Sequence, residues 1–294
     1  MLLRWLAPLT FVALALFSSS AAGMGVPPPR VPVRVVDVRG AAAILSRGAA
    51  VLDARDAAAF AQGHLPGAQM YAWQSFTGEG SARGRVKPDA RALAQSVAAL
   101  GVDGGRPALI YGGGAGGWGE EGHAAWLLAL LGHPDVALLD GGFSAWKSAG
   151  RPVVASHARA AAGRFEARPR GDLLARREDV DAARVQIVDV RSAAEFRGAT
   201  PHGEARGGHI VGARNVDWRS MLDADGRMLP ASRLLRVLGA AGVDPQREIV
   251  TCCTCGVRSA MAAVALSSRG LGPVRSYDGS MAEWAADPAA PMER

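Results

Sequence analysis

All of the cysteine in this chain lies in one short segment. The stretch IVTCCTCGVRSAM, from Ile249 to Met261, holds Cys252, Cys253 and Cys255, which are the 3 cysteines among the 294 residues. Structural disulfides in exported proteins join cysteines that lie apart in the sequence, and a zinc site normally takes four ligands. Three clustered thiols with no neighbouring histidine suit neither purpose. The segment therefore predicts a reactive thiol.

The residues around the cysteines favour a negatively charged sulfur. An apolar, strand-like run (EIVTC) enters the segment, and an apolar, helix-like run (SAMAAVALSSRG) leaves it. In open parallel sheets, ligands bind beyond the carboxyl ends of the strands, where a helix N-terminus attracts anions. Gly256 permits a tight turn, and Arg258 offers a planar fork of donors to an oxyanion or a persulfide. The loop is thus suited to a thiolate nucleophile and an incoming anion.

The elements that must position this loop occur twice in the chain. Three motifs of the first half return in order in the second: VLDARDAAAF as IVDVRSAAEF, GHLPGA as GHIVGA, and LLDGGFSAW as SYDGSMAEW. The second copy carries the extra residues RGATPHGEARG before its GHIVGA motif. In both copies apolar strands alternate with helical stretches, which indicates α/β units around a largely parallel sheet. The repeats predict two homologous domains.

The domain boundaries follow from the repeats and the composition. Residues 1–23 are expected to be a secretory signal peptide, because a positive N-terminus and a short apolar run precede the small residues SSSAA. We expect a first domain over 30–154, a polar linker over 155–172 and a second domain over 173–294. The protein would then be periplasmic or secreted, with no membrane contact after cleavage of the signal.

The charge of the chain bears on its partners. The net charge is +6, but it comes mostly from dispersed arginines rather than from a dense basic run with interleaved aromatics. This distribution does not favour nucleic-acid binding, and it suits a small anionic substrate. We expect a monomer.

Taken together, the motifs resemble those of the tandem rhodaneses, a family of two-domain sulfurtransferases. The resemblance rests on Asp-x-Arg, GHLPGA and GHIVGA, the loop CTCGVR, and DGGFSAW with YDGSMAEW, and it covers nearly the whole chain after the signal peptide. It implies two rhodanese-like α/β domains, each a mainly parallel five-stranded sheet flanked by helices. It implies no metal and no organic cofactor.

The resemblance places the nucleophile at Cys253. In the family, the catalytic cysteine begins a six-residue turn that has a glycine three positions later, and Gly256 fixes that register here. Cys253 would take a sulfane sulfur from a donor, hold it as a persulfide and pass it to cyanide or a thiol. The corresponding loop of the first copy, YGGGAGGWGEEG, has no cysteine. The first domain is therefore expected to be inactive and to pack over the second.

The other candidate site residues fall into two groups. A supporting ion pair is expected between Asp189 and Arg191. Contacts with the substrate are expected from the loop and from the inserted segment, at Thr254, Cys255, Gly256, Val257, Arg258 and Arg206.

The donor is expected to be thiosulfate. The mercaptopyruvate and thiosulfate enzymes of the family commonly carry a donor-binding arginine where this sequence has Glu195. A carboxylate at that position would repel the carboxylate of 3-mercaptopyruvate.

Other functions remain open at this point. One is 3-mercaptopyruvate sulfurtransferase activity. Another is a thiol redox or sulfur-carrier module that uses the C-x-x-C spacing between Cys252 and Cys255. A third is a non-catalytic binding module, as rhodanese-like domains without the cysteine can be. A phosphatase is disfavoured, because the loops of related phosphatases have one more residue between the cysteine and the arginine.

Overall fold

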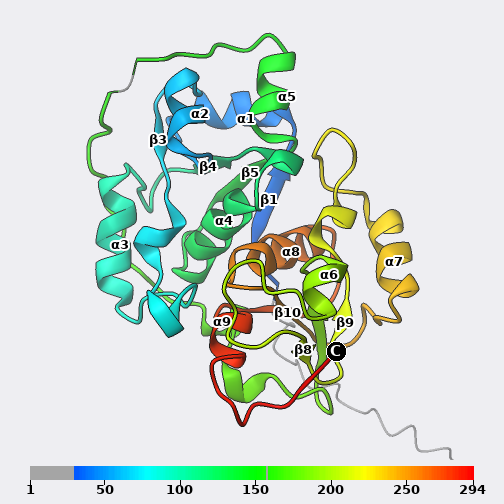
Figure 1. Ribbon diagram of the computed structural model, residues 1–294. Helices are drawn as coiled ribbons and strands as arrows, with labels where there is room; N and C mark the ends of the chain where they lie inside the picture. Colours follow the sequence, from blue (N-terminus) through cyan, green and yellow to red (C-terminus); the bar gives the residue numbers. More distant parts are fainter. Residues whose placement is uncertain (1–29, 157) are drawn as a thin grey trace, which may run out of the picture.

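The computed structural model describes residues 30–156 and 158–294 (Figure 1). The expected signal peptide over 1–23 lies outside these residues. The first domain has a five-stranded parallel sheet in the order β1-β5-β4-β2-β3. Its strands are β1 (Val33–Val36), β2 (Ala50–Asp53), β3 (Ala68–Met70), β4 (Ala108–Tyr111) and β5 (Val136–Leu139). Its α-helices are α1 (Val38–Leu45), α2 (Ala57–Gln62), α3 (Ala90–Ala99), α4 (Glu120–Leu130) and α5 (Gly142–Ser148).

The second domain repeats this sheet, which confirms the expected α/β fold. Its strands lie in the order β6-β11-β10-β7-β9, and all of them are parallel. These strands are β6 (Leu174–Ala175), β7 (Gln186–Asp189), β9 (Arg214–Asn215), β10 (Ile249–Cys252) and β11 (Val274–Tyr277). The α-helices are α6 (Ala193–Phe196), α7 (Ala231–Ala240), α8 (Val257–Ser268) and α9 (Ser280–Trp284). A separate antiparallel pair joins β8 (His209–Ile210) to β12 (Met292–Glu293).

The central strands are buried because helices cover both faces of each sheet. Every residue of β2, β4, β5, β7 and β10 is buried. Continuous apolar runs such as ALIY and VALL are typical of such strands. Helix α7, by contrast, buries Leu234 and Leu238, which lie four residues apart on one face. The period of the apolar residues thus separates the buried strands from the surface helix.

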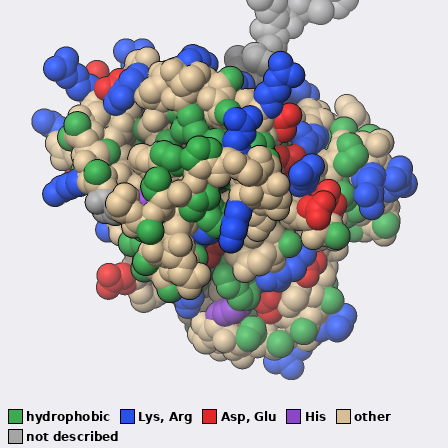
Figure 2. All heavy atoms as spheres, turned by 90° about the horizontal axis from the view of Figure 1, so that it is seen from above, with side chains coloured by type: hydrophobic (Ala, Val, Ile, Leu, Met, Phe, Trp, Pro, Cys, Tyr) green, Lys and Arg blue, Asp and Glu red, His purple; other side chains and the backbone are tan. Residues whose placement is uncertain are grey.

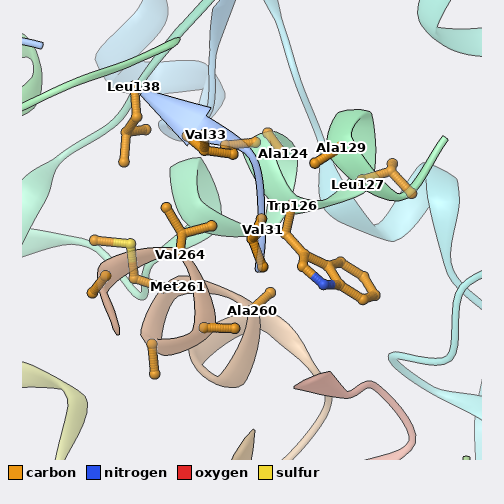
Figure 3. Close-up of a cluster of buried hydrophobic side chains, with 14 of the residues drawn as sticks. Val31, Val33, Ala124, Trp126, Leu127, Ala129, Leu138, Ala260, Met261 and Val264 are labelled. Atoms are coloured by element: carbon orange, nitrogen blue, oxygen red, sulfur yellow. The ribbon is translucent and has the colours of Figure 1, made fainter. Parts of the chain in front are cut away.

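The two domains share one apolar core. Helices α4 and α8 pack against each other at the centre of the molecule, and Figure 3 shows side chains of both helices, among them Trp126 and Ala260, in one buried apolar cluster. Nearly all of α8 is buried. Helix α8 begins directly after the cysteine loop, so this shared core fixes the loop relative to both domains.

The segment expected to link the domains runs along the first domain. Its described residues have no regular secondary structure until a short 3-10 helix at Gly171–Leu173. The Gly163 N–H donates to the Ala98 carbonyl (2.8 Å), and the Arg168 N–H donates to the Leu131 carbonyl (2.8 Å). The segment is therefore packed rather than free.

The surface carries its positive charge in separate places. Figure 2 shows Lys and Arg side chains scattered over the visible face, with no continuous basic stripe. Among the described helices, none combines the length and the apolar character needed to cross a bilayer.

Candidate active site

The cysteine loop lies at the carboxyl end of β10, in the centre of the second sheet. Successive side chains of a β-strand point to opposite faces of the sheet, so Cys252 and Cys253 are expected on different faces. Cys252 is fully buried in a core cluster with Ile187 and Tyr277, and this burial raises the pKa of its thiol well above the usual value. Cys253 belongs to the other cluster, which contains α8. Cys255 is only partly buried, so it does not share the closed surroundings of Cys252, and the structure gives no support to a redox pair of these two cysteines.

Cys253 is held by two serine hydroxyls. Its backbone N–H donates to Ser280 Oγ (3.0 Å), and its Sγ lies 3.9 Å from that oxygen and 3.8 Å from Ser259 Oγ. Ser280 has φ 48°, the one positive φ outside glycine in the described residues, and Gly142 occupies the matching turn of the first domain. A serine in this costly conformation is explained by its hydroxyl, which supports the cysteine loop.

Gly256 makes the turn from the loop into α8. Its φ is +81°, and a Cβ atom there would lie 2.7 Å from the Asp278 carbonyl oxygen. Only glycine fits this position without a shift of the backbone. The first turn of α8, whose N–H groups have no partner within the helix, therefore begins immediately beyond the cysteines.

The predicted pair of Asp189 and Arg191 lies under the loop. Both side chains are buried, Arg191 Nη2 is 2.7 Å from Asp189 Oδ2, and the same nitrogen donates to the Gly208 carbonyl (2.8 Å). The first domain has the same arrangement at Asp53 and Arg55, although its loop has no cysteine. The recurrence favours a structural role for this pair.

The sequence predicts that Arg258 offers a free fork of donors to a substrate, but in the structure this fork is already occupied. Its Nη1 and Nη2 donate to the two carboxylate oxygens of Glu195, at 2.9 and 2.7 Å, and Nη2 also donates to Thr254 Oγ1 (2.7 Å). Burial by itself would raise the pKa of Glu195, but the hydrogen bonds and charge of Arg258 outweigh it and lower that pKa to about 2. Arg258 is thus neutralised, and Glu195 does not face a donor as a free carboxylate.

Arg206 lies away from the loop, contrary to expectation. Its guanidinium donates to backbone carbonyls of the C-terminal segment, among them Ala285 (3.1 Å) and Ala290 (3.0 Å). Every contact the structure gives it is with the backbone of that segment. Arg206 therefore holds the end of the chain rather than a substrate.

A cavity of about 320 Å³ opens over the cysteines. The second domain lines it with the expected residues Cys253, Thr254, Cys255, Val257 and Arg258, and also with His202. Cys255 is partly exposed there, and the pKa of its thiol is raised to about 12 by burial and by its electrostatic interaction with Cys253. Within the described residues, no group of three or more His, Cys, Asp or Glu side chains is arranged to hold a metal ion.

The first domain supplies the remaining walls of the cavity, which sequence reasoning missed. These residues are Trp73, Gln74, Arg83, Trp118 and Glu120. Trp118 belongs to the glycine-rich loop that replaces the cysteine loop of the first copy, and its ring lies 5.4 Å from the Arg258 guanidinium. His202 belongs to the segment inserted in the second copy. The sequence shows both segments, as a long glycine-rich loop and as an insertion, but it does not indicate that either of them lies over the active site.

Comparisons with known proteins agree with this architecture. The model of the rhodanese-like domain matches residues 33–149 and 171–287. The sulfur carrier protein TtuD of Thermus thermophilus is 31% identical over 238 residues, covering 76% of this chain and 82% of that protein. A thiosulfate sulfurtransferase of Azotobacter vinelandii is 30% identical over 248 residues, covering 83% and 90%.

A solved structure shows the same fold over most of the chain. It is that of SseA from Escherichia coli, described with the 3-mercaptopyruvate sulfotransferases, and it has a TM-score of 0.75 at 25% sequence identity. The similarity covers 84% of this chain and 98% of SseA. With both domains matched and a cysteine loop in the second, the chain belongs to the rhodanese family as a tandem-domain sulfurtransferase.

Proposed function

We propose that Cys253 carries the transferred sulfur as a persulfide, with thiosulfate as the donor. The observation that carries the proposal is the position of Cys253, which lines the cavity at the carboxyl end of β10 and lies next to the first turn of α8. A helix N-terminus stabilises negative charge on sulfur and so favours the thiolate form of a nearby cysteine.

The proposed reaction has two steps. The Cys253 thiolate attacks the outer sulfur of thiosulfate, the sulfur–sulfur bond of the donor breaks, and sulfite leaves with the electron pair. Cyanide or a thiolate then attacks the outer sulfur of the persulfide, which regenerates the Cys253 thiolate and releases thiocyanate or a new persulfide. No electrons enter or leave overall, so the cycle needs no separate oxidant.

Thiosulfate should be the better donor, but for a reason that differs from the sequence argument. Among the described cavity-lining residues the arginines are Arg83 and Arg258, and Glu195 neutralises the second. These residues therefore provide no second free arginine that could bind the carboxylate of 3-mercaptopyruvate while its sulfur faces Cys253. We expect kcat/KM to be about tenfold higher for thiosulfate, as measured by thiocyanate formation, because a missing charge contact in a cleft costs about 1 kcal/mol or more. Equal or faster turnover of 3-mercaptopyruvate would favour the alternative activity.

We also propose that the protein is exported through cleavage of its N-terminal segment. The support is the positive N-terminus, the short apolar run from Leu6 to Phe17 and the small residues before Gly23. N-terminal sequencing of the protein from its native host should find a start close to Gly23. An intact Met1 in a membrane fraction would contradict this.

A further inference from the structure

Each domain contributes a loop that packs against the other domain, one at the cysteine loop and one at the corresponding cysteine-free loop. From the first domain, Gly84 approaches Cys255 so closely that a Cβ atom would lie 2.2 Å from the Cys255 carbonyl oxygen. Two residues later, the Val86 N–H donates to Asp278 Oδ2 (2.8 Å). This loop therefore forms part of the wall beside the cysteines.

The second domain returns the same contact. Gly226 lies against the cysteine-free loop, where its Cβ atom would be 2.7 Å from the Ala115 nitrogen. The Met228 N–H donates to Asp140 Oδ1 (2.8 Å), as Val86 does to Asp278. The two loops are therefore equivalent: each makes the same kind of contact with the other domain, as expected for a pseudo-twofold relation between the domains.

The two loops differ most in one charge. They read ARGRV over 82–86 and ADGRM over 224–228, so Arg83 corresponds to Asp225. Arg83 lines the cavity that contains Cys253, whereas Asp225 lines the cavity at the cysteine-free loop. The next arginine of each loop also differs in its place, because Arg227 lines the counterpart cavity together with Asp225, whereas Arg85 pairs with Glu283 and does not line the cavity with Cys253. The loop that faces the nucleophile therefore contributes an arginine without a carboxylate, and the loop that faces the counterpart cavity contributes a carboxylate and an arginine.

Arg83 has the free charge that Arg258 lacks. Its Nη1 donates to the His202 carbonyl (3.2 Å), its side chain is exposed, and in the described part of the chain it forms no ion pair. The other charged group of the first domain in this cavity, Glu120, accepts the Trp118 N–H (2.7 Å). We propose that Arg83, supplied by the domain without a cysteine, binds the oxyanion group of the sulfur donor over Cys253. The proposal rests on the function proposed above for Cys253.

The first test measures donor binding. In Arg83→Ala, KM for thiosulfate should rise about tenfold while kcat stays within about twofold, because the contact is with the donor rather than with the reacting sulfur. Arg83→Lys should recover part of the loss. Arg91→Ala removes an exposed arginine of α3 outside the cavity and should leave both constants unchanged. An unchanged KM in Arg83→Ala would overturn the proposal.

The second test separates this proposal from the proposed function. Iodoacetate and iodoacetamide alkylate the same thiol, but only iodoacetate is an anion. Site-resolved mass spectrometry should find that Arg83→Ala slows the reaction of Cys253 with iodoacetate several-fold and leaves the rate with iodoacetamide unchanged. This result without any thiosulfate turnover by the unaltered protein would retain Arg83 as an anion site and reject the donor. Equal slowing with both reagents would show a merely structural role and overturn the proposal.

Discussion

Replacement of Cys253 by serine should abolish both sulfur loading and turnover. After treatment with thiosulfate, the unaltered protein should gain one sulfur by intact-mass measurement, and Cys253→Ser should gain none. Thiocyanate formation should fall by about a thousandfold or more, since a hydroxyl at this position cannot form the persulfide.

The other two cysteines provide matched controls in the same loop. Cys255→Ser should still load, because Cys253 keeps its contacts with Ser259 and Ser280. Cys252→Ala should also load, and alanine is preferable to serine there because an unpaired hydroxyl would be costly in the core. Loading that survives in Cys253→Ser and disappears in Cys255→Ser would place the nucleophile at Cys255 and reject the assigned register.

The parts of the molecule that could be predicted are those encoded by local sequence. Strand β10, the loop and α8 follow one another without a break, so EIVTC, the cysteines and SAMAAVALSSRG are sufficient to locate the thiols at a strand end. The repeated motifs similarly predict the second sheet from the first. Gly256 is recognisable because its turn needs a positive φ, and the structure gives it +81°.

The partners of charged side chains could not be predicted in the same way. Glu195 and Arg258 lie 63 positions apart, and nothing in either segment indicates that the carboxylate fills the arginine fork. Arg206 bonds to carbonyls about 80 residues later, and Arg83 reaches the site from the other domain. These contacts depend on how the elements pack, which amino-acid spacing does not encode. They also change which charges a donor meets in the cavity, because Arg258 is paired and, among the described residues, Arg83 is not.

Loss of the Glu195 carboxylate should strongly destabilise the protein. Both side chains of the Glu195–Arg258 pair are 5% exposed, and Glu195→Ala would leave the Arg258 charge buried beside Thr254 without a counter-ion. Such a loss typically costs about 3–5 kcal/mol of unfolding free energy. Denaturant unfolding at pH 7 should show this as a lower midpoint. The double variant Glu195→Leu/Arg258→Met should recover much of the stability, because it removes both charges.

The pH dependence gives this prediction a second signature. The pKa of Glu195 is lowered to about 2 in the folded protein, against about 4.3 for an unfolded chain. Between these values the unfolded chain binds the proton and the folded one does not, so the contribution is complete above about pH 4.3 and is lost as the pH falls towards 2. Glu195→Gln should lack this part of the acid sensitivity.

The exposed pair of Arg170 and Asp172, whose side chains are 41% and 45% exposed, provides the control for the stability measurement, and Asp172→Ala should cost less than about 1 kcal/mol. If Glu195→Ala were no less stable than Asp172→Ala, the buried pair would not be what holds the loop in place.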